Sequence, residues 1–531
     1  MLFTSYEFVL VFLPVVAAMT YAMSALGRHD LAKLVVLGAS FVFYGWWNPI
    51  YVPLLIAMIA FNYAIGSWLI RTRDREDLAR ARLAAVSLGV AANVLALGYF
   101  KYTNFLVDVI NGATGAEIAI AEIALPLGIS FIVFQKIAFL VDAYSGQIQR
   151  LGLLDYSVFV SFFPQLIAGP IVHHREVIPQ LVEPSSLRYQ ARVVPIALAF
   201  FVIGACKKVL LADPLSPYVA EVFTTASAGG HPGVLGAWSA SLAFTLQVYF
   251  DFSGYSDMAI GLGLLFGIRL PANFNSPLKA TSMIEFWSRW HMTLTRFLTA
   301  YIYNPIVLRI TRRRMQQGRK IATRGVMRPG AFVQLLVGPT LITMFIAGLW
   351  HGAGFQFIVF GLLHGVYLVV NHAWRNSRPS GSGRSPGSPL AGAVVASRVA
   401  TFVALVVSIP WFRGDSAHTA WSFATSMVGL HGAGHARLDG GTLLLIVALL
   451  VVTQIFPNSQ ELLRTQLESE TAPLAKHAGA GKTMDPAHAA SWSWPRIAWR
   501  PTIAWALALG LVAWIVVLRM AAPTEFLYFQ F

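Results

Sequence analysis

The sequence predicts an all-α, polytopic integral membrane protein with roughly 11 to 13 hydrophobic helices. Hydrophobic residues make up 56% of the 531-residue chain and charged residues only 12%, which is more apolar surface than one soluble core needs. About 20 apolar residues span the hydrocarbon core of a bilayer. Other apolar windows are shorter, so we expect some half-length or re-entrant helices. Windows without Asp, Glu, Lys or Arg include 8–25, 51–70, 331–350 and 442–456.

The distribution of positive charge gives the expected topology. The net charge is +15, which in a soluble protein would suggest nucleic acid, but here the basic residues lie between hydrophobic segments. The positive-inside rule explains them without a nucleic-acid partner. Expected spans at 6–26, 31–47 and 50–70 precede the segment 71–82, which holds five arginines. If the three preceding segments all cross, placing that segment in the cytoplasm puts the N-terminus outside, which is the periplasmic side if the membrane is a bacterial inner membrane.

Several function classes lack support in the sequence. The single cysteine, Cys206, excludes an internal disulfide framework and a cysteine-based metal site. The chain contains no GxSxG elbow, HExxH motif or P-loop. The first residues lack the basic region of a secretory signal, so we expect the first segment to be an uncleaved span.

The next segments carry polar residues within apolar runs. After an expected span at 83–101, Lys136 and Asp142 interrupt the run 125–146; they either snorkel near a membrane face or line a polar cavity. Two prolines in 162–172 predict a bent or re-entrant segment. His173 and His174 follow it, and we interpret them as an interfacial loop rather than metal ligands, because no second ligand pair has suitable spacing.

The stretch 249–305 holds the densest group of polar residues, and ionisable groups at membrane depth indicate a functional site. We predict that four of them line a cavity, although the two aspartates could instead cap helix ends. From residue 282 the pattern is amphipathic, with an aromatic face opposite charged residues, so this helix would lie at the interface or at a cavity mouth. The predicted cavity-lining residues are Asp251, Asp257, Asn273 and Glu285.

Two histidines are the candidate catalytic residues. The reference pKa of a histidine is ~6.5, so the side chain can take a proton from a hydroxyl at neutral pH and return it to a leaving group. His351, between Trp350 and Gly352 in the segment 348–355, is the better placed base. His291, at the edge of the aromatic face, is the second candidate. The alternative for each is a packed, hydrogen-bonded histidine, which is also our interpretation of His364.

The remaining segments set topology or connect helices. Residues 309–328 hold eight Arg or Lys and no acid; this block marks the cytoplasmic side, and it could also attract a polyanionic cofactor. Residues 375–398 and 457–500 are predicted to be polar loops or linkers. A last hydrophobic helix is expected at 501–519. We see no two-fold internal repeat, which argues against a transporter built from inverted halves.

Six motifs together resemble the membrane-bound O-acyltransferase family, and within it the bacterial branch of the alginate O-acetyltransferase membrane subunit. They span nearly the whole chain, so the resemblance implies a single membrane domain over 1–531, with tilted helices around a central tunnel. The motifs are LPLGISFIVFQKIAFLVD, FPQLIAGPIV, YFDFSGYSDMAIGLGLLFGIRLPANFNSP, EFWSRWHMTLTRFLTAYIYNP, GLWHGAGFQFIVFGLLHG and FLYFQF.

The resemblance also implies roles for individual residues. The catalytic histidine of the family falls on His351 and its second polar motif residue on His291. The expected acyl donor is cytosolic acetyl-CoA, near which we place Arg289, Arg296 and Trp350, and no metal is expected. The expected setting is the bacterial inner membrane, in contact with lipid, where a periplasmic partner of the SGNH-hydrolase type would acetylate a polysaccharide.

The sequence departs from the family pattern after the histidine helix, where Thr299 and Ala300 precede Tyr301 in place of the usual arginine-aspartate-tyrosine continuation. The polymer is therefore open: an alginate-like exopolysaccharide, cellulose or a cell-wall glycan would fit. Two other hypotheses stay open. One is a transporter or flippase of polysaccharide precursors without acyl chemistry, and the other is a lipid or protein acyltransferase.

Overall fold

The structure is a computed structural model that describes residues 1–183, 186–323, 326–377, 391–434, 438–471, 497–520 and 526–527. The chain forms two units. The first unit comprises Met1–Leu210, Asp251–Ala272 and Pro457–Gln530; the second comprises Leu211–Phe250 and Asn273–Phe456, with Phe531. Helix α11 (Gly233–Leu265) contributes its first part to the second unit and its last part to the first.

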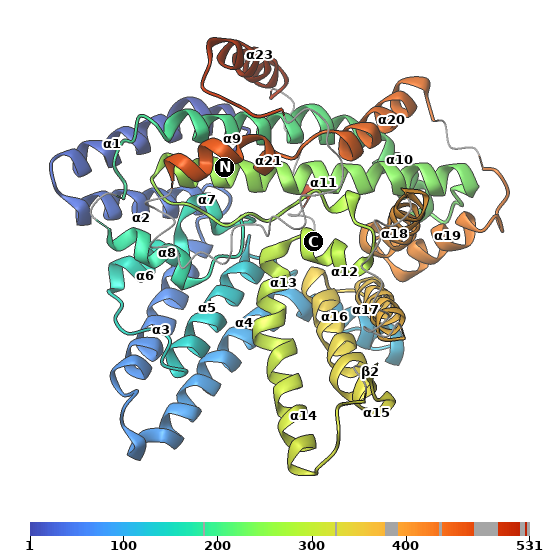
Figure 1. The fold of residues 1–531 in the computed structure, drawn as a ribbon, viewed down its shortest axis with the longest axis horizontal. Helices are drawn as coiled ribbons and strands as arrows, with labels where there is room; N and C mark the ends of the chain where they lie inside the picture. The colour runs from blue at the N-terminus through green and yellow to red at the C-terminus, as the bar shows by residue number, and fades with distance from the viewer. Residues whose placement is uncertain are drawn as a thin grey trace. The chain divides into compact units, whose positions relative to one another are not determined.

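The first unit is a set of helices packed in pairs. Figure 1 shows α3, α4 and α5 side by side, and α5 packs against both of the others. Helix α9 packs against α21 and α23. The elements are η1 (Glu7–Phe12), α1 (Leu13–Ala25), α2 (His29–Gly45), α3 (Tyr51–Arg71), η2 (Glu76–Leu78), α4 (Ala79–Thr114), α5 (Ile129–Tyr144), α6 (Leu153–Ser161), α7 (Phe163–Leu166), α8 (His174–Val182), α9 (Val194–Cys206), η3 (Lys207–Ala212), α21 (Ser459–Glu470) and α23 (Ile503–Arg519).

The second unit carries a series of helices in which each packs on the next: α16 on α17, α17 on α18 and α18 on α19. Its only described strands are two residues long and pair antiparallel. The elements are η4 (Asp213–Leu215), α10 (Ser216–Ser227), η5 (Pro277–Lys279), α12 (Met283–Arg289), α13 (Met292–Leu298), η6 (Thr299–Tyr303), α14 (Asn304–Gln316), β1 (Ala322–Thr323), β2 (Val326–Met327), α15 (Pro329–Phe332), η7 (Val333–Val337), α16 (Gly338–His351), α17 (Phe355–Asn376), α18 (Ala391–Arg413), α19 (Ala417–Met427) and α20 (Gly440–Ile455).

The predicted fold class, an all-α polytopic membrane protein, is confirmed. Among the described residues, nine helical stretches are long and apolar enough to cross a membrane. Helix α23, with 17 residues, and α5, with 16, fall short of a full span. The spans are Glu7–Ala25, Tyr51–Arg71, Glu76–Thr114, Val194–Ser227, Gly233–Leu265, Pro329–His351, Phe355–Asn376, Gly392–Arg413 and Gly440–Glu470.

Two glycines allow α16 and α17 to pack closely (Figure 1). A Cβ atom at Gly348 would overlap the carbonyl oxygen of Phe357, and one at Gly361 would overlap that of Met344. Only glycine fits where two helix backbones approach this closely. The contact fixes the C-terminal end of α16, which carries His351.

The structure corrects three local predictions. Lys136 and Asp142 do not snorkel, because both are buried in the protein, with exposures of 0% and 2%. The range 457–500 is not all loop: α21 begins there with a capping box in which Asn458 and Glu461 satisfy each other's backbone N–H groups. Helices α17 and α18 also extend into the predicted linker 375–398, and residues 378–390 and 472–496 lie outside the described residues.

Candidate active site

His291 lies at a break between two short helices, where the sequence pattern suggested one continuous amphipathic helix. Its backbone has φ 41° and ψ 53°, the left-handed region that a residue other than glycine adopts only when its surroundings impose it. Two backbone hydrogen bonds flank the break: Met292 N donates to Asn273 O at 2.9 Å, and Asn275 N donates to Arg289 O at 2.9 Å. The segment 273–275 therefore holds the break in place.

Asn273 orients the His291 ring. The side-chain oxygen of Asn273 accepts a hydrogen bond from Thr293 Oγ1 at 2.9 Å and lies 3.0 Å from His291 Nδ1. Because an amide oxygen is only an acceptor, Nδ1 carries the proton in this arrangement and Nε2 keeps its lone pair. Burial lowers the pKa of His291 to about 3, so the imidazole is neutral at pH 7.

Trp350 lies next to both candidate histidines. Its ring centroid is 5.9 Å from that of His291 and 4.8 Å from that of His351. The His351 ring is also edge-on to Phe412, at 5.1 Å, and 6% of this residue is exposed. The fold thus brings together two histidines 60 residues apart in the sequence; we call His291, Trp350 and His351 the histidine cluster.

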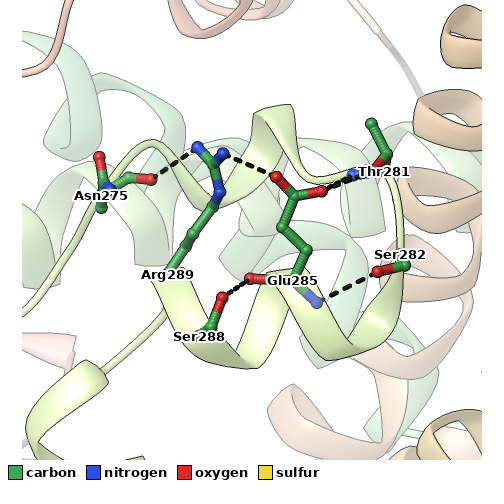
Figure 2. A network of polar contacts seen from close by, with 6 residues as sticks. All are labelled: Asn275, Thr281, Ser282, Glu285, Ser288 and Arg289. Carbon is green, nitrogen blue, oxygen red and sulfur yellow. Dashed lines mark hydrogen bonds and ion pairs between the residues drawn. The ribbon is translucent and has the colours of Figure 1, made fainter. Parts of the chain in front are cut away.

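A charged network supports the segment that orients His291 (Figure 2). Glu285 Oε2 accepts hydrogen bonds from the backbone N and Oγ1 of Thr281 at 2.7 and 2.6 Å, and Glu285 Oε1 pairs with Arg289 Nη2 at 2.6 Å. Arg289 Nη1 in turn donates to Asn275 O at 3.4 Å. Burial alone would raise the pKa of the Glu285 carboxyl, but the Thr281 hydrogen bonds and the Arg289 charge outweigh it and lower the pKa.

The amphipathic pattern of α12 and α13 corresponds to their burial. Phe286, Trp287 and Leu294 are buried, whereas Arg296 is exposed. Glu285 and Arg289, predicted as a cavity-lining and a donor-binding residue, are half-buried and bonded to each other. The donor-binding roles of Arg289, Arg296 and Trp350 remain predictions.

His364 is a packed, hydrogen-bonded histidine, as expected from the sequence. Trp287 Nε1 donates to His364 Nδ1 at 3.3 Å, and His364 Nε2 lies 2.9 Å from Ser408 Oγ. Because the Ser408 hydroxyl donates to Leu405 O, it accepts from His364 Nε2. Both ring nitrogens of this buried residue are therefore satisfied, which indicates a structural role.

Asp251 and Asp257 belong to the first unit, where lysines engage them. Lys208 Nζ lies 2.7 Å from Asp251 Oδ1, and Lys207 Nζ lies 2.6 Å from Asp257 Oδ2. Both aspartates lie within α11, so they do not cap the ends of their own helix. Helix α11 continues through Gly254 because it packs tightly there: a Cβ atom at Gly254 would approach Gly204 O to 2.7 Å.

Sequence reasoning missed the two lysines as partners. The Lys208 side chain is only 6% exposed. The available signal was a pair of lysines and a pair of aspartates, both in apolar segments, where charges are expected to pair. Asp251 Oδ2 also accepts a hydrogen bond from Leu527 N at 3.2 Å, and Ser459 Oγ donates to Asp257 Oδ2 at 2.7 Å.

Comparisons with known proteins place the sequence in a family. The profile of the membrane-bound O-acyltransferase family matches residues 85–322. The chain is 36% identical over 466 residues to the peptidoglycan O-acetyltransferase of Helicobacter pylori, covering 83% of this chain and 82% of that protein. It is 32% identical over 545 residues to a probable alginate O-acetylase of Azotobacter vinelandii, covering 100% of both chains.

A more distant similarity covers part of the chain. The teichoic acid D-alanyltransferase of Bacillus subtilis is 26% identical over 244 residues, which is 46% of this chain and 58% of that protein. The full-length similarity to the probable alginate O-acetylase carries the assignment. The chain belongs to the membrane-bound O-acyltransferase family, in the branch that contains the alginate O-acetylases, and is a multi-pass membrane O-acyltransferase.

Proposed function

We propose that the protein moves an acetyl group from cytosolic acetyl-CoA across the bacterial inner membrane for O-acetylation of a polysaccharide outside the cytoplasm. The observation that supports this most is the histidine cluster, in which two buried histidines both lie next to Trp350. The relatives named above act, by their names, on alginate, peptidoglycan and teichoic acid. All three acceptors are polymers of the cell surface, so an acceptor of that class fits this chain.

The two histidines have different roles in this proposal. His351 is the general base: it takes the proton from the attacking hydroxyl as the oxygen bonds to the thioester carbonyl carbon. When the carbon–sulfur bond breaks, His351 returns the proton to the leaving sulfur. His291, whose low pKa makes it a weak base, positions the acceptor: its Nε2 lone pair accepts a hydrogen bond from a neighbouring sugar hydroxyl, because the attacking hydroxyl has only one proton and gives it to His351. The hydrogen bond between His291 Nδ1 and Asn273 sets this tautomer.

The basic block after α13 is the proposed donor entrance, because the phosphates of CoA need cationic partners. Within it Arg314 is buried and holds the chain itself, with Nη1 2.8 Å from Gln334 Oε1 and Nη2 3.2 Å from Lys320 O. Arg312 and Arg313 are exposed on α14. They are therefore the arginines that we assign to the CoA phosphates.

Transfer of radiolabelled acetyl in membrane vesicles from the source bacterium tests the direction and the donor. Inverted vesicles present the cytoplasmic face to added acetyl-CoA, and right-side-out vesicles do not. We expect labelled polymer with inverted vesicles that contain the parent protein. Right-side-out vesicles, and inverted vesicles that contain His351→Ala, should give no labelled polymer. His372→Ala, which changes a half-buried histidine at the end of α17, is the matched control. Equal labelling by the parent and His351→Ala would contradict the proposal.

The remaining alternatives make different predictions in the same assay. A flippase of polysaccharide precursors would move labelled saccharide without consuming acetyl-CoA, but family membership favours acyl chemistry. A lipid or protein acyltransferase would place the label in the lipid or protein fraction. Extraction of the vesicles into polymer, lipid and protein fractions separates these outcomes. We also propose that a periplasmic partner of the SGNH-hydrolase type completes the transfer; washing the luminal proteins out of the vesicles should then abolish polymer labelling.

A further inference from the structure

A group of three metal-ligating side chains lies in the first unit, apart from the residues assigned above. Asp142 is in the last turn of α5, and His173 and His174 begin α8. Each offers one ligand atom, and these three atoms lie within 4.8 Å of one another. Within the described part of the chain, no other group of three or more His, Cys, Asp or Glu side chains meets this description.

The carboxylate of Asp142 lies against both imidazole rings. Its Oδ2 is 2.7 Å from His173 Nε2 and 3.2 Å from His174 Nδ1. The two rings are themselves close, with centroids 4.2 Å apart. One carboxylate oxygen facing two imidazole nitrogens is the donor set that proteins use for zinc and related divalent ions.

The hydrogen bonding of the buried His174 ring is a second, independent observation that points to a metal ion. Its exposed fraction is 7%, and neither of its ring nitrogens makes a hydrogen bond, although Nδ1 is directed toward Asp142. A buried nitrogen without a hydrogen bond destabilises the folded protein. No direct hydrogen bond to Asp142 satisfies His174 Nδ1. A cation bound between this nitrogen and the Asp142 carboxylate would satisfy it.

We propose that Asp142, His173 and His174 bind one divalent first-row transition metal ion, with Zn²⁺ as the representative, and that it joins the end of α5 to the start of α8. This replaces the expectation from sequence spacing of an interfacial loop without metal, because the third ligand, Asp142, comes from a distant segment. Three protein ligands leave a further position for water. Arg175, the adjacent cation, directs its guanidinium to Gln147 Oε1 at 2.8 Å. The site is independent of the histidine cluster and of the proposed reaction.

Metal binding by His173 requires one change in the position of its ring proton and in its hydrogen bonding. His173 Nδ1 accepts a long hydrogen bond from Arg175 N at 3.3 Å, so Nε2 carries the ring proton in the metal-free form. Binding a metal through Nε2 moves that proton to Nδ1 and removes this bond. The other part of the capping box, from His173 N to Glu176 Oε2 at 2.9 Å, does not depend on the ring and is kept.

Metal titration of the purified full-length protein in detergent tests the proposal. After dialysis against EDTA, we expect the parent to bind one Zn²⁺ per chain, measured by calorimetry and elemental analysis, and to gain thermal stability. Loss of a group that only hydrogen-bonds to a metal ligand lowers metal affinity about 10- to 100-fold, so loss of a ligand in Asp142→Asn or His174→Ala should lower it by about 100-fold or more. Failure of the parent to bind Zn²⁺ above the level of His174→Ala would overturn the proposal.

A matched control addresses metal binding by histidines outside the proposed site. His231 and His431 stack with ring centroids 3.7 Å apart, but they belong to no group of three among the described residues. The double variant His231→Ala/His431→Ala should bind Zn²⁺ like the parent; loss of binding in this variant would place the metal elsewhere. If Asp142→Asn or His174→Ala fails to fold, the site is tested instead by the visible absorption spectrum of the parent protein with added Co²⁺. Bands typical of four-coordinate nitrogen and oxygen ligands support the site, and the spectrum of aqueous Co²⁺ contradicts it.

Discussion

The buried polar residues of the two units satisfy their charges in different ways. In the first unit Asp251 and Asp257 pair with Lys208 and Lys207 at 2.7 and 2.6 Å; we call these four residues the ion-pair cluster. In the second unit the histidine cluster consists of aromatic rings, with Nδ1 of His291 held by Asn273. Paired charges hold segments together, whereas an imidazole next to a tryptophan can still exchange protons. We therefore propose a structural role for the first cluster and a chemical role for the second.

The largest expected effect on stability comes from breaking one pair of the ion-pair cluster. Asp251→Ala leaves the Lys208 ammonium in a buried site, and breaking such a pair costs about 3–5 kcal/mol. Chemical unfolding in detergent should show this loss of unfolding free energy. The matched double variant Asp251→Leu/Lys208→Met removes both charges and should recover most of it. If the single variant unfolds like the parent, the cluster is not a structural element.

Removing the group that orients His291 should mainly affect activity. In Asn273→Ala the imidazole loses its Nδ1 partner, so the tautomer that is protonated at Nδ1 is no longer favoured. By analogy with the groups that orient metal-bound histidines, we expect kcat to fall about 10- to 100-fold, while the unfolding free energy falls by no more than about 3 kcal/mol. Steady-state kinetics and unfolding on the same preparation measure both.

A conservative variant tests the role of Asn273 through the pH dependence of the rate. Asn273→Asp keeps an oxygen acceptor for His291 Nδ1 but adds a negative charge, which favours the imidazolium and raises the pKa of His291 above about 3. The acidic limb of the pH–rate profile should then move to higher pH. A purely structural role for Asn273 would leave the position of this limb unchanged.

The smallest expected effect concerns Glu285, whose lowered pKa favours the folded state. The sign follows from linkage: a carboxyl with a depressed folded-state pKa contributes stability above its unfolded pKa of about 4.3, and this is lost as pH falls through the folded value. Comparing thermal midpoints at pH 7 and pH 4 should show a smaller decrease for Glu285→Gln than for the parent. An identical decrease in both proteins would exclude Glu285 as a contributor.

The general architecture could be predicted from the sequence because its signals are local. Long apolar windows predict spans, and the alternation of aromatic and charged residues after Ser282 predicts the buried face of α12 and α13. The packing role of His364 also followed from its apolar surroundings. The motifs that resemble the O-acyltransferase family lie close together in the sequence, and the comparisons confirm that assignment.

The interactions that join distant segments could not be predicted. Lys208 and Asp251 are 43 residues apart, and Asp142 and His173 are 31 apart, so local spacing does not reveal either contact. The break at His291 was missed for a similar reason. Its left-handed backbone is imposed by hydrogen bonds with the segment 273–275, whereas helical periodicity considers only neighbouring residues. His291 and His351 could be named as candidate catalytic residues from the sequence, and the structure places both next to Trp350; their catalytic roles stay predictions.

The most direct test of the account compares two histidines of the second unit. Acetyl transfer per folded molecule and unfolding free energy are measured for His351→Ala and His364→Ala. We predict that His351→Ala loses about 10²- to 10⁴-fold in rate with nearly parental stability. His364→Ala, which leaves the hydrogen-bonding groups of Trp287 and Ser408 unmatched, should lose mainly stability. If His351→Ala transfers acetyl at the parental rate, the histidine cluster is not the catalytic site.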